Sequence, residues 1–247
     1  MKRMTLSLLS LVFLIGTTSC SIRFNGNEEL KPSATQVTKK YHVNNFQQIE
    51  SNVPAQIIFT QSDICRVEAE GPENYVAHLV ISTKDNQLSI KLDDPKIRFR
   101  NLKSNAVVLT ISAPTLLTLS HKGVGDIHLK GDIQVGNLGI SNKGVGDIRT
   151  DNLTCNQLSV SNGGVGDITL KGQAQEVEYY SKGVGDIHAE EMKAKKTKAE
   201  LNGVGDISCH ASQSITATSK GVGDIDIYGH PETKNLSKKG VGSIKEQ

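Results

Sequence analysis

The stretch Gly123-Val124-Gly125-Asp126-Ile127 recurs along the whole second half of the chain. Intact copies of Gly-Val-Gly-Asp-Ile begin at Gly123, Gly144, Gly164, Gly183, Gly203 and Gly221. A seventh copy, which begins at Gly240, has Ser243 in place of the aspartate. The copies are 21, 20, 19, 20, 18 and 19 residues apart, and a period near 20 is typical of one coil of a β-solenoid. The repeat therefore predicts an all-β protein, a single-stranded β-helix with coils of about 20 residues.

Each copy carries two glycines, which we expect to form a tight corner between two strands. Glycine adopts positive φ without strain and lets neighbouring coils approach closely, so a change such as Gly125→Val should damage the stack. The fourteen corner glycines are Gly123, Gly125, Gly144, Gly146, Gly164, Gly166, Gly183, Gly185, Gly203, Gly205, Gly221, Gly223, Gly240 and Gly242.

Apolar residues alternate on both sides of the corner, as they do in half-buried strands. The motif isoleucine and the residue two positions later share one face, and so do the residues four and six positions before the first glycine. In the first copy these residues are Ile127, Leu129, Leu119 and Leu117. Each coil is therefore expected to run strand, glycine corner, strand, variable loop, with neighbouring coils about 4.8 Å apart.

Residues 40–120 lack the motif but keep the alternation, for example at Leu88, Ile90 and Leu92. We expect them to form an irregular β region that starts the same solenoid, because Leu117 and Leu119 already hold the register of the repeat. A separate small β domain is the alternative. The regular β-helix is expected over residues 121–247.

The amino terminus predicts export. Lys2 and Arg3 precede an apolar run over residues 6–15, whose helical length of ~15 Å is half of a bilayer core, so residues 1–19 are expected to be a cleaved signal peptide. The small residues before Cys20 resemble a bacterial lipobox, which predicts acylation of Cys20; cleavage by the ordinary signal peptidase is the alternative. Residues 20–39 are polar and without a period, and they predict a flexible, lipid-anchored tether.

The charge balance disfavours a nucleic-acid partner. The chain has 28 Lys and Arg residues against 26 Asp and Glu residues, and removal of residues 1–19 takes away Lys2 and Arg3 and no acid. The mature chain is then electrically balanced, and it lacks the basic excess of a nucleic-acid binder.

The motif aspartates should form a row along the stack. They could be cation or ligand sites, but the expected role is structural, with each carboxylate accepting hydrogen bonds from backbone N–H groups. Only the last copy, which has no complete coil after it, lacks the aspartate, so each carboxylate is expected to cap the following coil. Neighbouring carboxylates 4.8 Å apart repel by ~0.9 kcal/mol even at the dielectric of water, and a row of lysines just before the motif is expected to compensate. The aspartates are Asp126, Asp147, Asp167, Asp186, Asp206 and Asp224, and the lysines are Lys122, Lys143, Lys182, Lys220 and Lys239.

No metal site, cofactor or disulfide is expected. His128 and His188 share a repeat position but lie three coils, ~14 Å, apart, too far to share one metal ion. The mature chain has an odd number of cysteines, Cys65, Cys155 and Cys209. Cys155 and Cys209 occupy different positions of the repeat, three coils apart, so small buried thiols are expected rather than a disulfide.

An enzyme acting on polysaccharides is the less favoured alternative. Catalytic carboxylates should break a repeat, whereas these obey it. The repeat half has no tryptophan or phenylalanine, and its tyrosines are Tyr179, Tyr180 and Tyr228. An exposed tyrosine cluster would favour binding, and a featureless charged surface would favour a scaffold.

Together, the exported amino terminus and the six intact Gly-Val-Gly-Asp-Ile copies resemble the bacterial family called the putative adhesin head domain, or GIN domain. The resemblance covers about residues 40–247, and it differs in having valine where the family pattern has serine, which makes the corner more apolar. It implies a single-chain β-solenoid at the cell envelope, and it transfers no binding or catalytic residue.

The sequence therefore predicts a non-enzymatic lipoprotein of the cell envelope, anchored to the outer membrane, that acts as an adhesin-like binding module. Its expected partners are the membrane, through the anchor, and an envelope glycan or protein. An inert envelope scaffold is the alternative.

Overall fold

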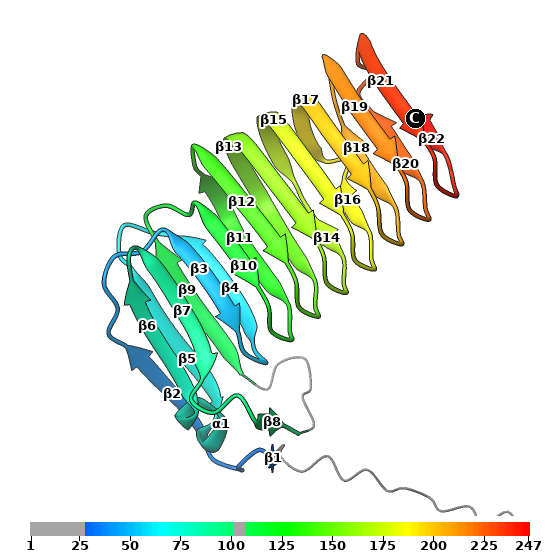
Figure 1. Cartoon of the computed structure of the whole chain (residues 1–247). Coiled ribbons are helices and arrows are strands. Elements are labelled where there is room, and N and C mark those ends of the chain that lie inside the picture. Colours follow the sequence, from blue (N-terminus) through cyan, green and yellow to red (C-terminus); the bar gives the residue numbers. More distant parts are fainter. Residues whose placement is uncertain (1–27, 101–106) are drawn as a thin grey trace, which may run out of the picture.

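The computed structural model describes residues 28–100 and 107–247, and within them the chain is nearly all β, with one short helix. The expected signal peptide and the acylation site Cys20 lie outside the described residues. The strands stack as a single row of coils, with the C-terminal coil at one end and the N-terminal β region at the other (Figure 1). This is the β-solenoid that the repeat predicts.

Strands that precede the corner form one parallel face, which we call face 1. Each strand pairs with the equivalent strand of the next coil, so that Leu138, for example, lies beside Leu158. In spatial order the face contains β7 (Gln87–Leu92), β3 (Gln48–Asn52), β10 (Thr118–His121), β12 (Asn137–Asn142), the ends of β13 (Ile148–Asn162), β15 (Gly172–Ser181) and β17 (Met192–Leu201), and then β19 (Ser214–Ser219) and β21 (Thr233–Lys238).

Strands that follow the corner form the second parallel face, face 2. The motif isoleucines stand in register on it, as Ile127 beside Ile148 shows. In order it contains β9 (Val108–Ala113), β4 (Gln56–Gln61), the starts of β11 (Ile127–Gln134) and β13, and then β14 (Ile168–Thr169), β16 (Ile187–Ala189), β18 (Ile207–His210), β20 (Ile225–Tyr228) and β22 (Ile244–Glu246).

The variable loop differs from the sequence expectation, because in four coils it contains a short third strand. Residues 132–134, 152–155, 172–174 and 192–194 pair in parallel from coil to coil. These coils are therefore three-sided, and the later coils, whose corresponding residues carry no strand, have two strands per coil. Leu153, Ala174, Met192 and Ala194 on this third side are buried, and so they add to the core.

The N-terminal region joins the same sheet directly, but its strands follow a different order in space than in sequence. Strand β3 pairs with β10, and β4 pairs with β11, so that β3 and β4 form a coil with Pro54 in the place of the corner valine. Strands β7 and β9 form the next coil outward. Three antiparallel strands, β2 (Gln36–Tyr41), β5 (Arg66–Pro72) and β6 (Leu79–Lys84), close this end.

The tether expected over residues 20–39 is wrong for its described part. Strand β1 (Glu28–Leu30) pairs with β8 (Ile97–Phe99), and β2 begins at Gln36 and pairs with β5. The short helix α1 (Glu73–Ala77) packs beside them and buries Tyr75, whose ring stacks on Phe99 with 3.9 Å between centroids. Strand β5 pairs with β9 on one side, and β2 pairs with its other side, which would otherwise be an open sheet edge.

The core is a column of mainly aliphatic side chains enclosed by the coils, with buried aromatic rings such as Phe59 and Tyr179 among them. The six intact motif isoleucines are fully buried, and Leu129, Cys209 and Ile227 lie beside them. Two expected positions differ: Leu117 is exposed, with Leu116 buried in its stead, and Leu236 in the last coil is exposed because no coil covers it. Burial is therefore shared between neighbours, as in other solenoids.

The two glycines of each corner serve different physical needs. Only the second has positive φ, for example +140° at Gly146. The first glycine is needed for space, because a Cβ on Gly144 would overlap the carbonyl oxygen of Gly123 in the preceding coil. A Cβ on Gly146 would likewise overlap the carbonyl oxygen of Gly125.

Candidate binding surface

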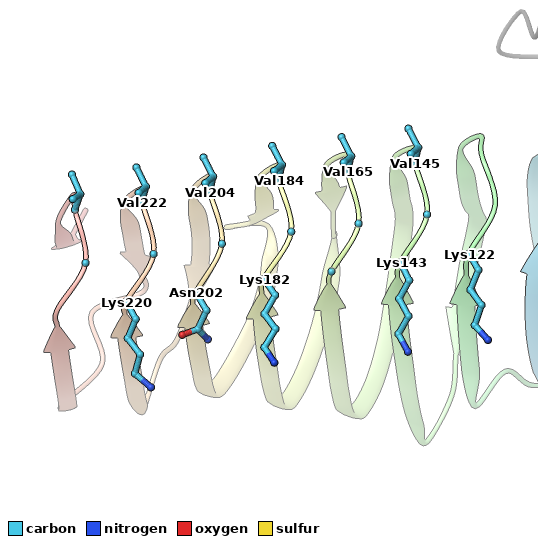
Figure 2. A pocket seen from close by; sticks show the side chains of 18 of the residues that line it. Lys122, Lys143, Val145, Val165, Lys182, Val184, Asn202, Val204, Lys220 and Val222 are labelled. Atoms are coloured by element: carbon cyan, nitrogen blue, oxygen red, sulfur yellow. The ribbon is translucent and has the colours of Figure 1, made fainter. Parts of the chain in front are cut away.

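The corner valines form a continuous exposed ridge along the solenoid, and we call these seven residues the valine ridge. Each valine makes a parallel β-bridge with the valine of the next coil, so that the side chains point outward in one line (Figure 2). Their exposed fractions run from 46% to 69%. The members are Val124, Val145, Val165, Val184, Val204, Val222 and Val241.

Backbone hydrogen bonds hold the ridge rigidly in place. The N–H of Val145 donates to the carbonyl of Gly123 at 2.9 Å, and the N–H of Gly125 donates to the carbonyl of Val145 at 2.8 Å. The same pair of bonds recurs at every following corner. Valine suits this extended backbone because its branched side chain favours β conformations.

A shallow groove of about 1100 Å³ runs beside the ridge over the first glycines of the corners. Its far wall is the residue before each motif, which is a lysine in five of the seven copies, and no acidic residue lines it (Figure 2). We call these lysines the lysine row; they are Lys122, Lys143, Lys182, Lys220 and Lys239. The groove is therefore apolar on one side and cationic on the other.

The motif aspartates lie on the opposite side of the ridge and bind the backbone of the next coil. Asp126 accepts a hydrogen bond from the N–H of Asp147 at 3.0 Å, and Asp167 accepts one from the N–H of Asp186 at 2.8 Å. The contact recurs at every intact copy, and Asp224 accepts bonds from both the N–H and the hydroxyl of Ser243. The carboxylates thus point toward the following coil, which is the direction expected from Ser243. The hydroxyl and N–H of Ser243 lower the pKa of Asp224.

The lysine row does not compensate the aspartates by contact, contrary to expectation. Among the described residues none of its members lies within ion-pair distance of a motif aspartate. Lys122 instead pairs with Glu50 at 2.7 Å, and Lys182 lies 4.8 Å from the ring centroid of Tyr180. Backbone N–H groups of the next coil, rather than lysines, therefore stabilise the negative charge of the motif aspartates.

A buried polar row, which the sequence analysis missed, lies directly beneath the corners. Asn142 accepts a bond from the N–H of Gly144 at 3.1 Å, and its amide donates to the carbonyl of Gly146 at 3.2 Å. Asn162 repeats the second contact at 2.8 Å. The signal was in the sequence, because the residue two positions before the motif is polar in five of the first six copies: His121, Asn142, Asn162, Ser181 and Ser219.

In the described part of the chain, the His128 ring pairs with Asp151 at 2.6 Å and lies 3.3 Å from the Arg149 guanidinium. No group of three or more His, Cys, Asp or Glu side chains among the described residues could hold a metal ion. Tyr179 is buried, whereas Tyr180 and Tyr228 lie on different faces and form no stacking platform. The thiols of Cys65, Cys155 and Cys209 are free, and burial raises the pKa of Cys155 to about 11 and that of Cys209 to about 12.

Comparison with known proteins places this architecture in a family. Residues 45–231 match the family model described as "Putative auto-transporter adhesin, head GIN domain". The chain belongs to this GIN-domain family. No match is found among curated proteins.

Solved GIN-domain-like structures share the fold. The crystal structure of a putative adhesin from Bacteroides fragilis NCTC 9343 is 42% identical, with a TM-score of 0.85, over 88% of this chain and 100% of the other. A putative adhesin from Parabacteroides merdae ATCC 43184 is 20% identical, with a TM-score of 0.69, over 88% of this chain and 99% of the other. A putative lipid binding protein from Parabacteroides distasonis ATCC 8503 is 20% identical, with a TM-score of 0.68, over 88% of this chain and 100% of the other. The last two likenesses show the fold alone.

Among the described residues, no helix is both long and apolar enough to span a membrane.

Proposed function

We propose that this GIN-domain protein is a non-enzymatic binding module of the cell envelope, and that the valine ridge is its docking surface. The observation that carries the proposal is the ridge itself: seven half-exposed valines in one unbroken line. Soluble surfaces rarely expose contiguous apolar stripes, and such stripes mark interaction sites. The 42% sequence identity with a putative adhesin of Bacteroides fragilis supports the same class of function.

The rigidity of the ridge suits a binding role. The backbone bonds between successive corners hold each valine in place before any partner arrives, so little conformational entropy is lost on binding. An inert scaffold, the alternative, gains nothing from an apolar line that water must solvate. The ridge therefore favours binding over a purely structural role.

The test is a glycan and host-protein array probed with the purified protein and with a Val165→Thr/Val184→Thr/Val204→Thr variant. Threonine keeps the branched shape and the β-propensity but replaces a methyl group with a hydroxyl, so the fold should persist while the ridge becomes polar. We expect the wild type to bind at least one class of ligand and the variant to lose it. Equal binding by both would remove the ridge from the function, and binding by neither would favour the scaffold.

The location of the module is part of the proposal. Acylation of Cys20 would anchor the mature chain to the outer membrane and leave the solenoid projecting from it. Metabolic labelling with an alkyne fatty acid should label the wild type and not Cys20→Ala. Equal labelling of the two proteins would refute the anchor and leave the docking surface to be tested by the array.

A further inference from the structure

The surface around the valine ridge is charged in a self-complementary way. In four of the seven copies a lysine lies two residues before the valine and an aspartate two residues after it, as in Lys143, Val145 and Asp147. The ridge thus separates a flank with five lysines from a flank with six aspartates. Lys143, Lys220 and Lys239 have no ion-pair partner within the described ranges, so their charge is free to meet another surface.

The aspartates also keep binding capacity. In Asp147 and Asp167, Oδ1 accepts the backbone hydrogen bond from the next coil. The second oxygen of each has no hydrogen-bond partner among the residues described here. The anionic flank can therefore accept an ammonium group without breaking the contacts that hold the coils together.

We propose that the valine ridge docks a second copy of this chain, as a parallel pair related by a two-fold axis that runs along the ridge. Rotation by 180° about such an axis exchanges the two flanks, so the lysine row of each copy faces the aspartate row of the other. It also leaves every coil level with the equivalent coil of its partner, because the axis is parallel to the stack. The interface is isologous, with the same patch used on both copies.

The shape of the surface fits the same operation. The groove beside the ridge is lined by glycines, which leave room for a projecting side chain. In the parallel pair the two valine ridges lie against each other along the axis, so that each valine faces its own equivalent and the groove of each copy lies directly beside the contact. The antiparallel pair would place lysines over lysines and aspartates over aspartates, which is repulsive.

The area of the ridge and its two flanks determines whether the pair can form in solution or only on a membrane. Six coil intervals of ~4.8 Å and a width of five residues give about 900 Å² for both copies together, below the 1,200–2,000 Å² of stable complexes. The pair is therefore weak in dilute solution, and it forms where two copies stand side by side on one membrane, since tethering raises the effective concentration. The pair thus rests on the proposed function and on the proposed lipid anchor. It gives the valine ridge a specific partner, a second copy of this chain.

Disulfide trapping in cells that express the full chain tests the pair and its direction. Val145 and Val222 lie in the second and sixth corners, symmetrically about Val184. In the parallel pair Val145→Cys lies opposite itself, so mild copper-phenanthroline oxidation should give a dimer on a non-reducing gel. In an antiparallel pair Val145→Cys would be trapped only when it is co-expressed with Val222→Cys.

The controls use the same chain. Thr216→Cys, an exposed position of β19 on face 1, should give no dimer, and Val165→Cys repeats the test in case the first variant does not fold. Introduction of Lys143→Glu and Lys220→Glu into Val145→Cys should lower the yield of dimer about fivefold, because two ion pairs on each side become repulsive.

Trapping only of the mixed pair, or of neither ridge variant, would overturn the parallel pair. If trapping fails while the threonine variant still loses its ligand on the array, the docking surface stands and the second copy is the wrong partner. If trapping succeeds and the array shows no ligand, the ridge serves self-association alone.

Discussion

At the scale of single residues, the motif aspartate joins neighbouring coils through a hydrogen bond. Its carboxylate accepts a backbone N–H of the following coil, which would otherwise have no partner at the corner. A carboxylate accepts such bonds strongly because it carries charge. The aspartate recurs once per coil because each coil has one such N–H group at its corner. We propose that this role is structural, and mutation can test it.

Replacement of an interior aspartate should destabilise the stack. Asp167→Ala leaves the N–H of Asp186 without its acceptor, and we expect the free energy of unfolding to fall by about 1 kcal/mol or more. Asp63→Ala, at an exposed position, is the matched control and should change little. Urea titration measures both, and added calcium should leave the melting temperature of the wild type unchanged. A strong calcium-dependent rise would assign the row to metal binding instead.

His121 predicts a pH dependence of stability. Burial lowers the pKa of His121 below its ordinary value of 6.5, and the backbone of Val145 and the Asp126 carboxylate offset this shift only in part. The folded state therefore binds fewer protons than the unfolded state below pH 6.5, so the free energy of unfolding falls as the pH drops through 6.5 toward the folded pKa.

The test for His121 follows from its neighbours in the stack. Asparagine occupies the same position in the next two coils, at Asn142 and Asn162, so His121→Asn should fold. Between pH 7.5 and 5.5 the variant should lose less of its melting temperature than the wild type, whereas His42→Asn, at an exposed position, should behave as the wild type. An equal loss in all three proteins would locate the pH dependence elsewhere.

At the scale of elements, the glycine corner sets how closely the coils can stack. Gly146→Ala places a Cβ against the carbonyl oxygen of Gly125 and forces alanine to a φ of +140°. Strained backbone costs about 1–3 kcal/mol, and displacement of a neighbouring coil adds to it. We therefore expect a large loss of unfolding free energy in chemical denaturation. Gly136→Ala, where a Cβ would meet nothing within 4 Å, should be nearly neutral, and equal losses would refute this account of the corner.

The same scale shows what the sequence could predict. The two main faces follow from the strict spacing of residues such as Ile127 and Leu119 around the motif, and the structure confirms this architecture. The third side was not predictable in this way, because its strands fall where the interval between motifs varies from 18 to 21 residues. The reordered N-terminal coils were hidden for a different reason, since the pairing of β4 with both β9 and β11 is long-range and leaves no local period.

The candidate surface was only half visible in the sequence. Valine at the corner marked it as more apolar than the family pattern, and the alternation that runs through the corner places Val145 outward and Ile148 inward. The bridges that join the valines of successive coils into one line appear only in the structure. Asn142 and Asn162 escaped notice because their partners are backbone groups of the corner itself.

At the scale of the whole molecule, the solenoid turns one five-residue motif into a surface that runs most of its length. If the proposed function holds, a partner in the cell envelope covers this surface. The rate at which a membrane-permeant maleimide labels Val184→Cys in living cells, compared with the purified protein, measures that cover directly, with Thr216→Cys as the exposed reference. We predict that labelling of Val184→Cys is several-fold slower in cells after normalisation to Thr216→Cys. Equal normalised rates in cells and in solution would show that no partner covers the ridge, and would rule out its role as a docking surface.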